Sequence, residues 1–122
     1  GLKSKNEKII EKYLIKNNIE YTYNKKFPDC KRIHHLKFDF YLPDYNFIIE
    51  YDGEFHFTHF DKFIPLEKFL AMQESDQIKN KYAKTKGINL LRIPCLESEE
   101  YLPILENALT SIDNKEGVFL IH

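Results

Sequence analysis

The chain has 122 residues, of which 43% are hydrophobic and 15% aromatic, so it can form one folded domain and is too apolar for a disordered tail. Its 18 basic and 19 acidic residues give a formal net charge of −1, which argues against a histone-like protein that grips nucleic acid through bulk positive charge. Two distant cysteines, Cys30 and Cys95, exclude a disulfide framework and a CxxC zinc site, and they indicate reduced thiols in a cytoplasmic protein.

The distribution of apolar residues and the first residues of the chain give two further expectations. No apolar stretch is long enough to span a membrane, and no signal peptide precedes the first helical pattern, so we expect no membrane partner. The chain begins with Gly1-Leu2 rather than with Met, which leads us to expect a trimmed chain or part of a longer protein.

The pattern of the first thirty residues or so predicts one helix and one strand. Ser4 and Glu7 have the spacing of a capping box, and the helical pattern that follows ends at residues 17–18. Aromatic and β-forming residues predict a strand over 19–27, closed by Phe27-Pro28-Asp29.

The next segment predicts a β-hairpin. Apolar and polar residues alternate over 36–42, which is typical of a half-buried strand. The turn 43–46 leads into a second strand over 47–52, and Gly53 ends it.

The rest of the chain predicts a helix over 65–86, a buried strand over 88–93 and a helix over 98–112. Residues 118–121 form a short apolar tail to which we assign no role. The order α-β-β-β-α-β-α predicts a single α/β domain over residues 1–122, with a mixed β-sheet flanked by helices.

Three acidic residues in the hairpin carry the predicted chemistry. Asp39 is expected on the strand face opposite Phe38 and Phe40, and Glu50 and Asp52 are two residues apart and so share a face. An acid inside an apolar strand is costly unless its charge is compensated. Three converging carboxylates repel each other unless a divalent cation lies among them, and such oxygen ligands suit Mg²⁺ or Mn²⁺. The alternative is a solvated sheet face on which these acids pair with lysines.

The residues around these acids resemble a known nuclease superfamily. The segments Phe38–Pro43 and Ile49–Gly53, followed by His56-Phe57, are similar to the PD-(D/E)XK superfamily. The closest likeness is to its very-short-patch-repair-like branch, including phage-type homing endonucleases with an EDxHD-style site. The resemblance extends from about Glu7 to Ile93. It implies a restriction-endonuclease-like core and Mg²⁺- or Mn²⁺-dependent hydrolysis of DNA phosphodiester bonds inside a phage-infected or bacterial cell.

The resemblance also implies roles for individual residues. Asp39 matches a metal ligand at the start of the family's hairpin, and Glu50 matches the acid of the E-x-K element. The lysine expected two residues later is replaced by Asp52, which we include among the metal ligands. His56 matches a histidine that acts as general base or acid in the repair-like branch. Glu7 matches an acid on the first helix that completes the site, although it can equally serve as a helix cap.

The long helix adds further candidates. Gln73 and Asp76 lie on a polar side that also carries Gln77 and Asn80, and they either orient a ligand or water or belong to a solvated face. Lys79 is a candidate for the missing lysine.

Three functions are therefore compared. The first is the catalytic domain of a homing or repair-type DNA endonuclease, which forms a homodimer if it cuts both strands and which relies on a recognition region outside this chain. Its basic stretches, Lys25-Lys26 with Lys31–His35 and Lys79–Lys86, are candidates for phosphate contacts. The second is a non-catalytic nucleic-acid-binding module with the same fold. The third is a zinc hydrolase that uses His56-x-x-His59 and Asp61.

Overall fold

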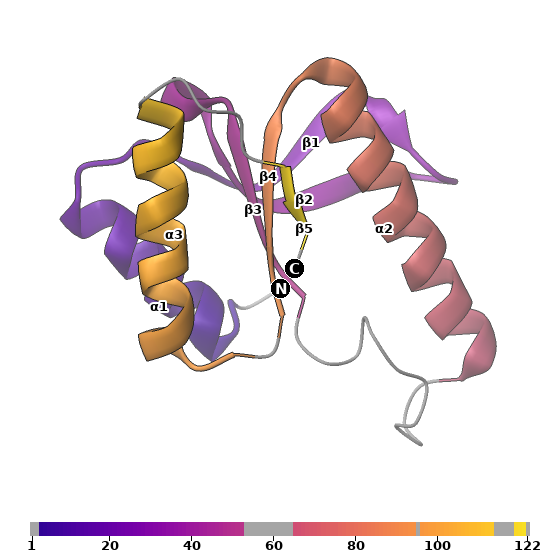
Figure 1. Cartoon of the computed structure of the whole chain (residues 1–122). Coiled ribbons are helices and arrows are strands. Elements are labelled where there is room, and N and C mark those ends of the chain that lie inside the picture. Colours follow the sequence, from indigo (N-terminus) through magenta and orange to yellow (C-terminus); the bar gives the residue numbers. More distant parts are fainter. Residues whose placement is uncertain (1–2, 53–64, 95, 114–118, 122) are drawn as a thin grey trace.

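The computed structural model describes residues 3–52, 65–94, 96–113 and 119–121, and it shows a mixed α/β domain (Figure 1). Its elements are, in chain order, α1 (Lys5–Lys16), β1 (Thr22–Lys31), β2 (His35–Leu42), the 3-10 turn η1 (Pro43–Tyr45), β3 (Phe47–Tyr51), α2 (Leu66–Lys86), β4 (Asn89–Ile93), α3 (Ser98–Asp113) and β5 (Phe119–Ile121). The predicted order is confirmed. The apolar tail adds β5, because it pairs with β4.

The five strands form one sheet in the order β1-β2-β3-β4-β5. The first three strands are antiparallel neighbours, which confirms the predicted hairpin of β2 and β3. β4 runs parallel to β3, and β5 runs parallel to β4. Each parallel connection carries a helix, as parallel strands require.

The helices cover both faces of the sheet, with α1 and α3 on one face and α2 on the other (Figure 1). Two hydrophobic clusters match these two layers. Residues such as Leu14 and Leu105 pack against Phe40 on the first face, and Ala83 of α2 packs with Phe38 and Ile48 on the second. None of the described helices is long and apolar enough to cross a membrane.

Local signals account for several boundaries. The capping box is complete, because Ser4 accepts from the N–H of Glu7 and Glu7 accepts from the N–H of Ser4. Gly87 ends α2 with a φ of 70°, a left-handed conformation that favours glycine. The prediction that the first strand closes at residues 27–29 is wrong, since β1 continues to Lys31. Pro28 is tolerated there because β1 is an edge strand whose pairing is irregular between Lys26 and Lys31.

The regular alternation of side chains between the two faces of the sheet is interrupted in β2 at Asp39. Phe38 belongs to the cluster on the α2 face, whereas Phe40 belongs to the cluster on the α1 and α3 face. The expectation that Phe38 and Phe40 share one face, with Asp39 opposite, is therefore wrong. The facing residue on β1, Asn24, has a φ of 54°, and the β1–β2 ladder skips this position. The twist removes Asp39 from regular pairing and so leaves its side chain available for other contacts.

Candidate functional site

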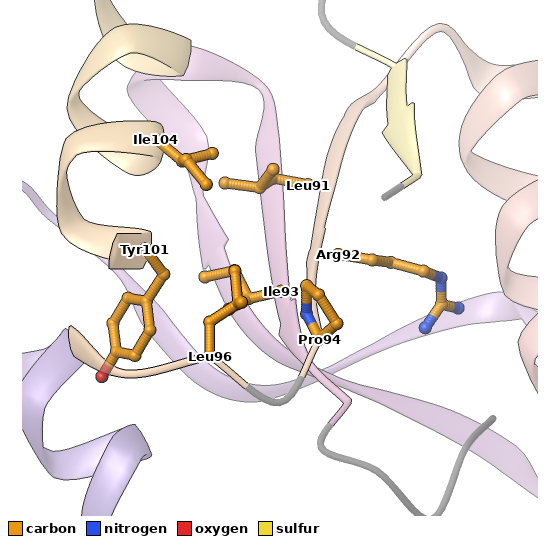
Figure 2. A pocket seen from close by; sticks show the side chains of 7 residues that line it. All are labelled: Leu91, Arg92, Ile93, Pro94, Leu96, Tyr101 and Ile104. Atoms are coloured by element: carbon orange, nitrogen blue, oxygen red, sulfur yellow. The ribbon is translucent and has the colours of Figure 1, made fainter. Parts of the chain in front are cut away.

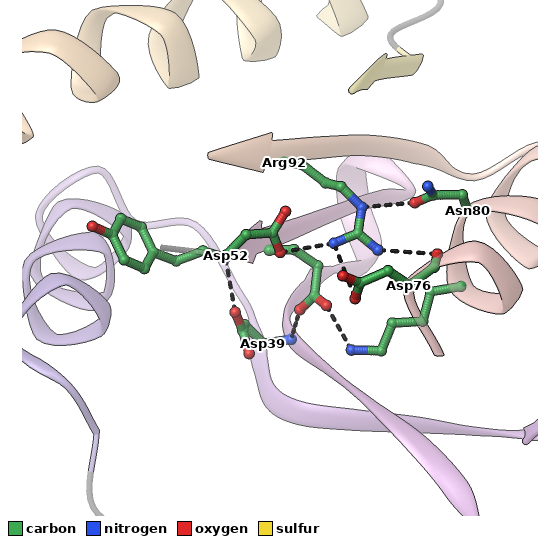
Figure 3. A network of polar contacts seen from close by, with 8 residues as sticks. Asp39, Asp52, Asp76, Asn80 and Arg92 are labelled. Carbon is green, nitrogen blue, oxygen red and sulfur yellow. Dashed lines mark hydrogen bonds and ion pairs between the residues drawn. The ribbon is translucent and has the colours of Figure 1, made fainter. Parts of the chain in front are cut away.

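The strands β2 and β3 separate at Asp39 and Glu50, and side chains replace the missing backbone pairs. The last paired residues of this ladder are Phe40 and Ile49. Beyond them the N–H of Asp39 donates to Oε2 of Glu50 at 2.6 Å, and the N–H of Tyr51 donates to Oδ2 of Asp39 at 2.8 Å (Figure 3). Both carboxylates are therefore fixed within the opening between two strands.

Lys79 of α2 reaches the same opening. Its Nζ donates to Oε1 of Glu50 at 2.6 Å, and the Glu50 side chain is only 3% exposed. The ammonium also lies 5.2 Å from the centroid of the Phe38 ring. Glu50 thus has one oxygen bound by the backbone of β2 and the other by a lysine from the long helix. Lys79 is the residue that the sequence analysis named as a candidate for the lysine missing after Glu50, and it contacts that acid.

Asp39 lies in an excess of negative charge. Burial raises the pKa of Asp39 to about 8, and the neighbouring carboxylates of Glu50 and then Glu7 add to this effect. The hydrogen bond from Tyr51 and the charge of Lys79 oppose it without cancelling it. The site therefore contains three acidic side chains, Asp39, Glu50 and Glu7, and one nearby positive charge, that of Lys79.

Glu7 is the helix cap that the sequence predicted, and it also lies close enough to Asp39 to affect its pKa. Its carboxylate closes the capping box of α1, and Oε1 also accepts a hydrogen bond from the hydroxyl of Tyr23 at 3.2 Å. The same carboxylate contributes to the raised pKa of Asp39. The cap thereby fixes an acid at the edge of the site.

Asp52 lies in a separate network centred on Arg92 of β4 (Figure 3). The guanidinium Nη1 of Arg92 is 2.7 Å from Oδ1 of Asp52 and 3.6 Å from Oδ1 of Asp76. Its Nε donates to Oδ1 of Asn80 at 2.7 Å, and its Nη2 donates to the backbone carbonyl of Asp76 at 3.3 Å. Arg92 is 2% exposed. This buried network joins the ends of β3 and β4 to the middle of α2.

The predicted residues thus separate into three groups. Asp39, Glu50, Glu7 and Lys79 surround the opening, whereas Asp52 and Asp76 bind Arg92 instead. Gln73 is half-buried and makes no hydrogen bond with another described residue. His56, His59 and Asp61 lie outside the described residues.

Asp39 and Glu50 are the two acids of the opening that could bind a metal ion. Within the described ranges, no three Asp, Glu, His or Cys side chains form a group that could hold a metal ion. Mg²⁺, however, usually binds proteins through one or two carboxylates and completes its shell with water and phosphate oxygens. The pair of Asp39 and Glu50, with its excess of negative charge, fits that requirement.

Sequence reasoning missed Arg92, although a signal was present. The strand over 88–93 is apolar apart from Asn89 and Arg92. A charged residue inside an apolar strand needs a partner of opposite charge, which is the argument that singled out Glu50. Applied to Arg92, the same argument would have indicated a buried acid such as Asp52 as its partner.

A small cavity of about 100 Å³ lies on the other side of β4, toward α3 (Figure 2). Its walls are mostly apolar and include Leu91, Ile93, Tyr101 and Ile104. The guanidinium of Arg92 points away from these side chains. The cavity therefore belongs to the core beneath α3 and not to the opening at Asp39.

Comparisons of the chain with protein-family models, with curated proteins and with solved structures found no match. The functional conclusion therefore depends on the residues and their geometry.

The raised pKa of Asp39 predicts a pH-dependent stability in metal-free buffer. A carboxyl whose pKa is higher in the folded chain favours folding below its unfolded pKa, and this contribution is lost as the pH rises from about 4 through about 8. Asp39→Asn is neutral throughout this range. It should therefore gain stability relative to the wild type with rising pH, by on the order of a few kcal/mol. Urea unfolding from pH 4.5 to 8.5 in EDTA measures this, with the exposed Asp44→Asn as control. Parallel curves for the wild type and Asp39→Asn would contradict the environment described.

The network of Arg92 predicts a large loss of stability when its cation is removed. Arg92→Met removes the ion-pair partner of the buried carboxylate of Asp52, which should cost about 3–5 kcal/mol of unfolding free energy. Lys86→Met removes an exposed ion pair with Asp29, which water screens, and it should lower the stability far less than Arg92→Met. Adding Asp52→Asn to Arg92→Met should recover part of the loss. Equal unfolding midpoints in urea for Arg92→Met and Lys86→Met would contradict a structural role for this network.

Proposed function

We propose that this chain is a metal-dependent endonuclease that hydrolyses DNA phosphodiester bonds and that its fold is the restriction-endonuclease-like core of the PD-(D/E)XK superfamily. The observation that carries the proposal is the opening between β2 and β3, where Asp39 and Glu50 lie together with Lys79. The resemblance of residues 38–57 to that superfamily supplies the reaction class. In this proposal double-strand cleavage uses a homodimer, and sequence recognition comes from a region outside the chain.

Lys79 supports the proposal because it meets the acid that matches the E-x-K element. The family's lysine would stand two residues after Glu50, where this chain has Asp52. Here a lysine from α2 contacts the same carboxylate at 2.6 Å. A lysine that enters from a helix can supply the same positive charge to the site as a lysine on the strand.

Asp39 and Glu50 are the residues that would hold a Mg²⁺ or Mn²⁺ ion, and Asp52 is left out because Arg92 binds its carboxylate. When bound, such an ion lowers the pKa of a coordinated water and offsets the negative charge of a phosphate. The N–H groups of β2 and β3 orient the two carboxylates, so little rearrangement is needed for ligation.

The remaining residues of the site act on protons and charge. Lys79 fixes the rotamer of Glu50 and places an ammonium beside the position of the phosphate, where it stabilises developing negative charge. Glu7 adds to the negative potential at Asp39 from the first turn of α1. His56 is proposed to activate the attacking water or to protonate the leaving oxygen.

One observation favours the second candidate, a nucleic-acid-binding module that does not cut. Glu50 and Asp52 each already have a cationic partner within the chain, Lys79 and Arg92. A fold that needs no metal could retain both ion pairs permanently. We rank this function second because, among the residues that the structure describes, these pairs leave Asp39 without an ion-pair partner of its own.

A plasmid-cleavage assay with Mg²⁺ or Mn²⁺ tests the proposal. Asp39→Asn and Glu50→Gln should abolish cleavage, and Lys79→Met should slow it about 100-fold or more, because each removes a ligand or a charge at the reacting phosphate. Lys81→Met removes an exposed lysine two residues away and should leave the rate unchanged. Wild-type cleavage by Asp39→Asn would overturn the proposal, and a wild-type chain that binds DNA without cutting it would favour the second candidate.

A further inference from the structure

A surface groove shares Lys79 with the opening between β2 and β3. This groove, of about 240 Å³, lies between the start of β2 and the first half of α2. Its walls are formed by Leu36, Lys37, Lys68, Ala71, Met72, Ser75, Asp76 and Lys79. Lys79 and Asp76 also belong to the two polar networks of the site, so the groove leads directly to the carboxylates of the opening.

The charges of this groove do not cancel. Lys79 is paired with Glu50, and Asp76 is paired with Arg92. The other two charged residues of its walls, Lys37 and Lys68, form no ion pair with any acid in the described part of the chain, and both are exposed. The groove therefore presents two positive charges that have no counterion among the described residues.

A third lysine lies next to Lys37. In the β1–β2 ladder Lys26 lies directly opposite Lys37, and both side chains are exposed. Like charges at directly opposed positions of a sheet repel each other and destabilise the pair. An anion bound between the two lysines would remove this repulsion.

Lys31, Lys81 and Lys84 are also exposed and form no ion pair among the described residues, but Lys31 and Lys81 line a different groove, beside Asp29 and Tyr82. Three further basic residues of the hairpin and of α2 are engaged within the protein. Lys25 lies over the rings of Phe27 and Tyr41, Arg32 pairs with Glu74, and Lys86 pairs with Asp29. The uncompensated charge beside the opening is therefore concentrated on Lys26, Lys37 and Lys68, which we name the lysine triad.

We propose that the lysine triad binds the phosphate backbone of double-stranded DNA and guides one strand along this groove to Asp39 and Glu50. Lys37 precedes Asp39 by two residues of β2, about 7 Å along the strand, so a phosphate held by Lys37 lies close to the opening. Backbone contacts of this kind fix the position of DNA and carry no sequence information. The inference depends on the proposed function only for the identity of the bond that is cut.

DNA binding in EDTA tests the triad without any cleavage. Fluorescence anisotropy of a labelled 20-base-pair duplex compares the wild type with the triple variant Lys26→Gln/Lys37→Gln/Lys68→Gln. Losing three phosphate contacts should weaken binding on the order of 100-fold at 0.1 M salt and should reduce the slope of log K against log salt by about 2–3. The matched control, Lys8→Gln/Lys12→Gln/Lys16→Gln, removes the same charge from the exposed side of α1 and should change binding less than about threefold.

A charge-retaining variant separates a lost contact from a damaged fold. Lys26→Arg/Lys37→Arg/Lys68→Arg should bind as the wild type does, because Arg also contacts phosphate. Equal losses in the triad variant and the α1 control, or a wild type without measurable binding, would overturn the inference.

Addition of Mg²⁺ to the same samples separates this inference from the proposed function. Triad-dependent binding without cleavage would support the groove and overturn the nuclease proposal. Wild-type cleavage by the glutamine triad variant at limiting DNA would overturn the groove and leave the nuclease proposal intact.

Discussion

Two carboxylates occupy the place where the backbones of β2 and β3 would otherwise pair with each other. Each is bound by a backbone N–H of the opposite strand, so the site and the sheet share the same hydrogen bonds. The twist of β2, with Phe38 on one face and Phe40 on the other, brings Asp39 to this position. The arrangement is costly, since burial and like charge raise the pKa of Asp39, and a cation from outside the chain would relieve it.

Two cationic side chains pair with two of the acids near this opening. Lys79 neutralises Glu50 and Arg92 neutralises Asp52, and both pairs are largely buried. The distinction matters for function, because the Arg92 pair joins β3, β4 and α2 and is thereby structural. The Lys79 pair lies beside Asp39, and Lys79 also lines the groove between β2 and α2, so in the proposed function it is the pair that meets the substrate. The two ion pairs have similar N–O distances, of 2.6 and 2.7 Å, but different surroundings.

The sequence predicted most of the elements because their signals are local. Helix caps and the periodicity of apolar residues depend on neighbours a few positions away, so their order is confirmed. Two features depend on strand pairing across the sheet, which no local pattern encodes. They are the interrupted alternation of side chains in β2 at Asp39 and the continuation of β1 past Pro28. The placement of Lys79 beside Glu50 was suggested by resemblance. The pairing of Asp52 with Arg92 was missed because the acid and the base lie forty residues apart on parallel strands.

The most direct test of the central claim is the position of a divalent ion. Crystals of the chain soaked with Mn²⁺ allow an anomalous difference map to locate the metal without any assumption about the reaction. We expect one strong peak between the carboxylates of Asp39 and Glu50, with the ion pair of Asp52 and Arg92 intact. A peak bound to Asp52, or no peak at Asp39 in crystals that hold Mn²⁺ elsewhere, would contradict the claim.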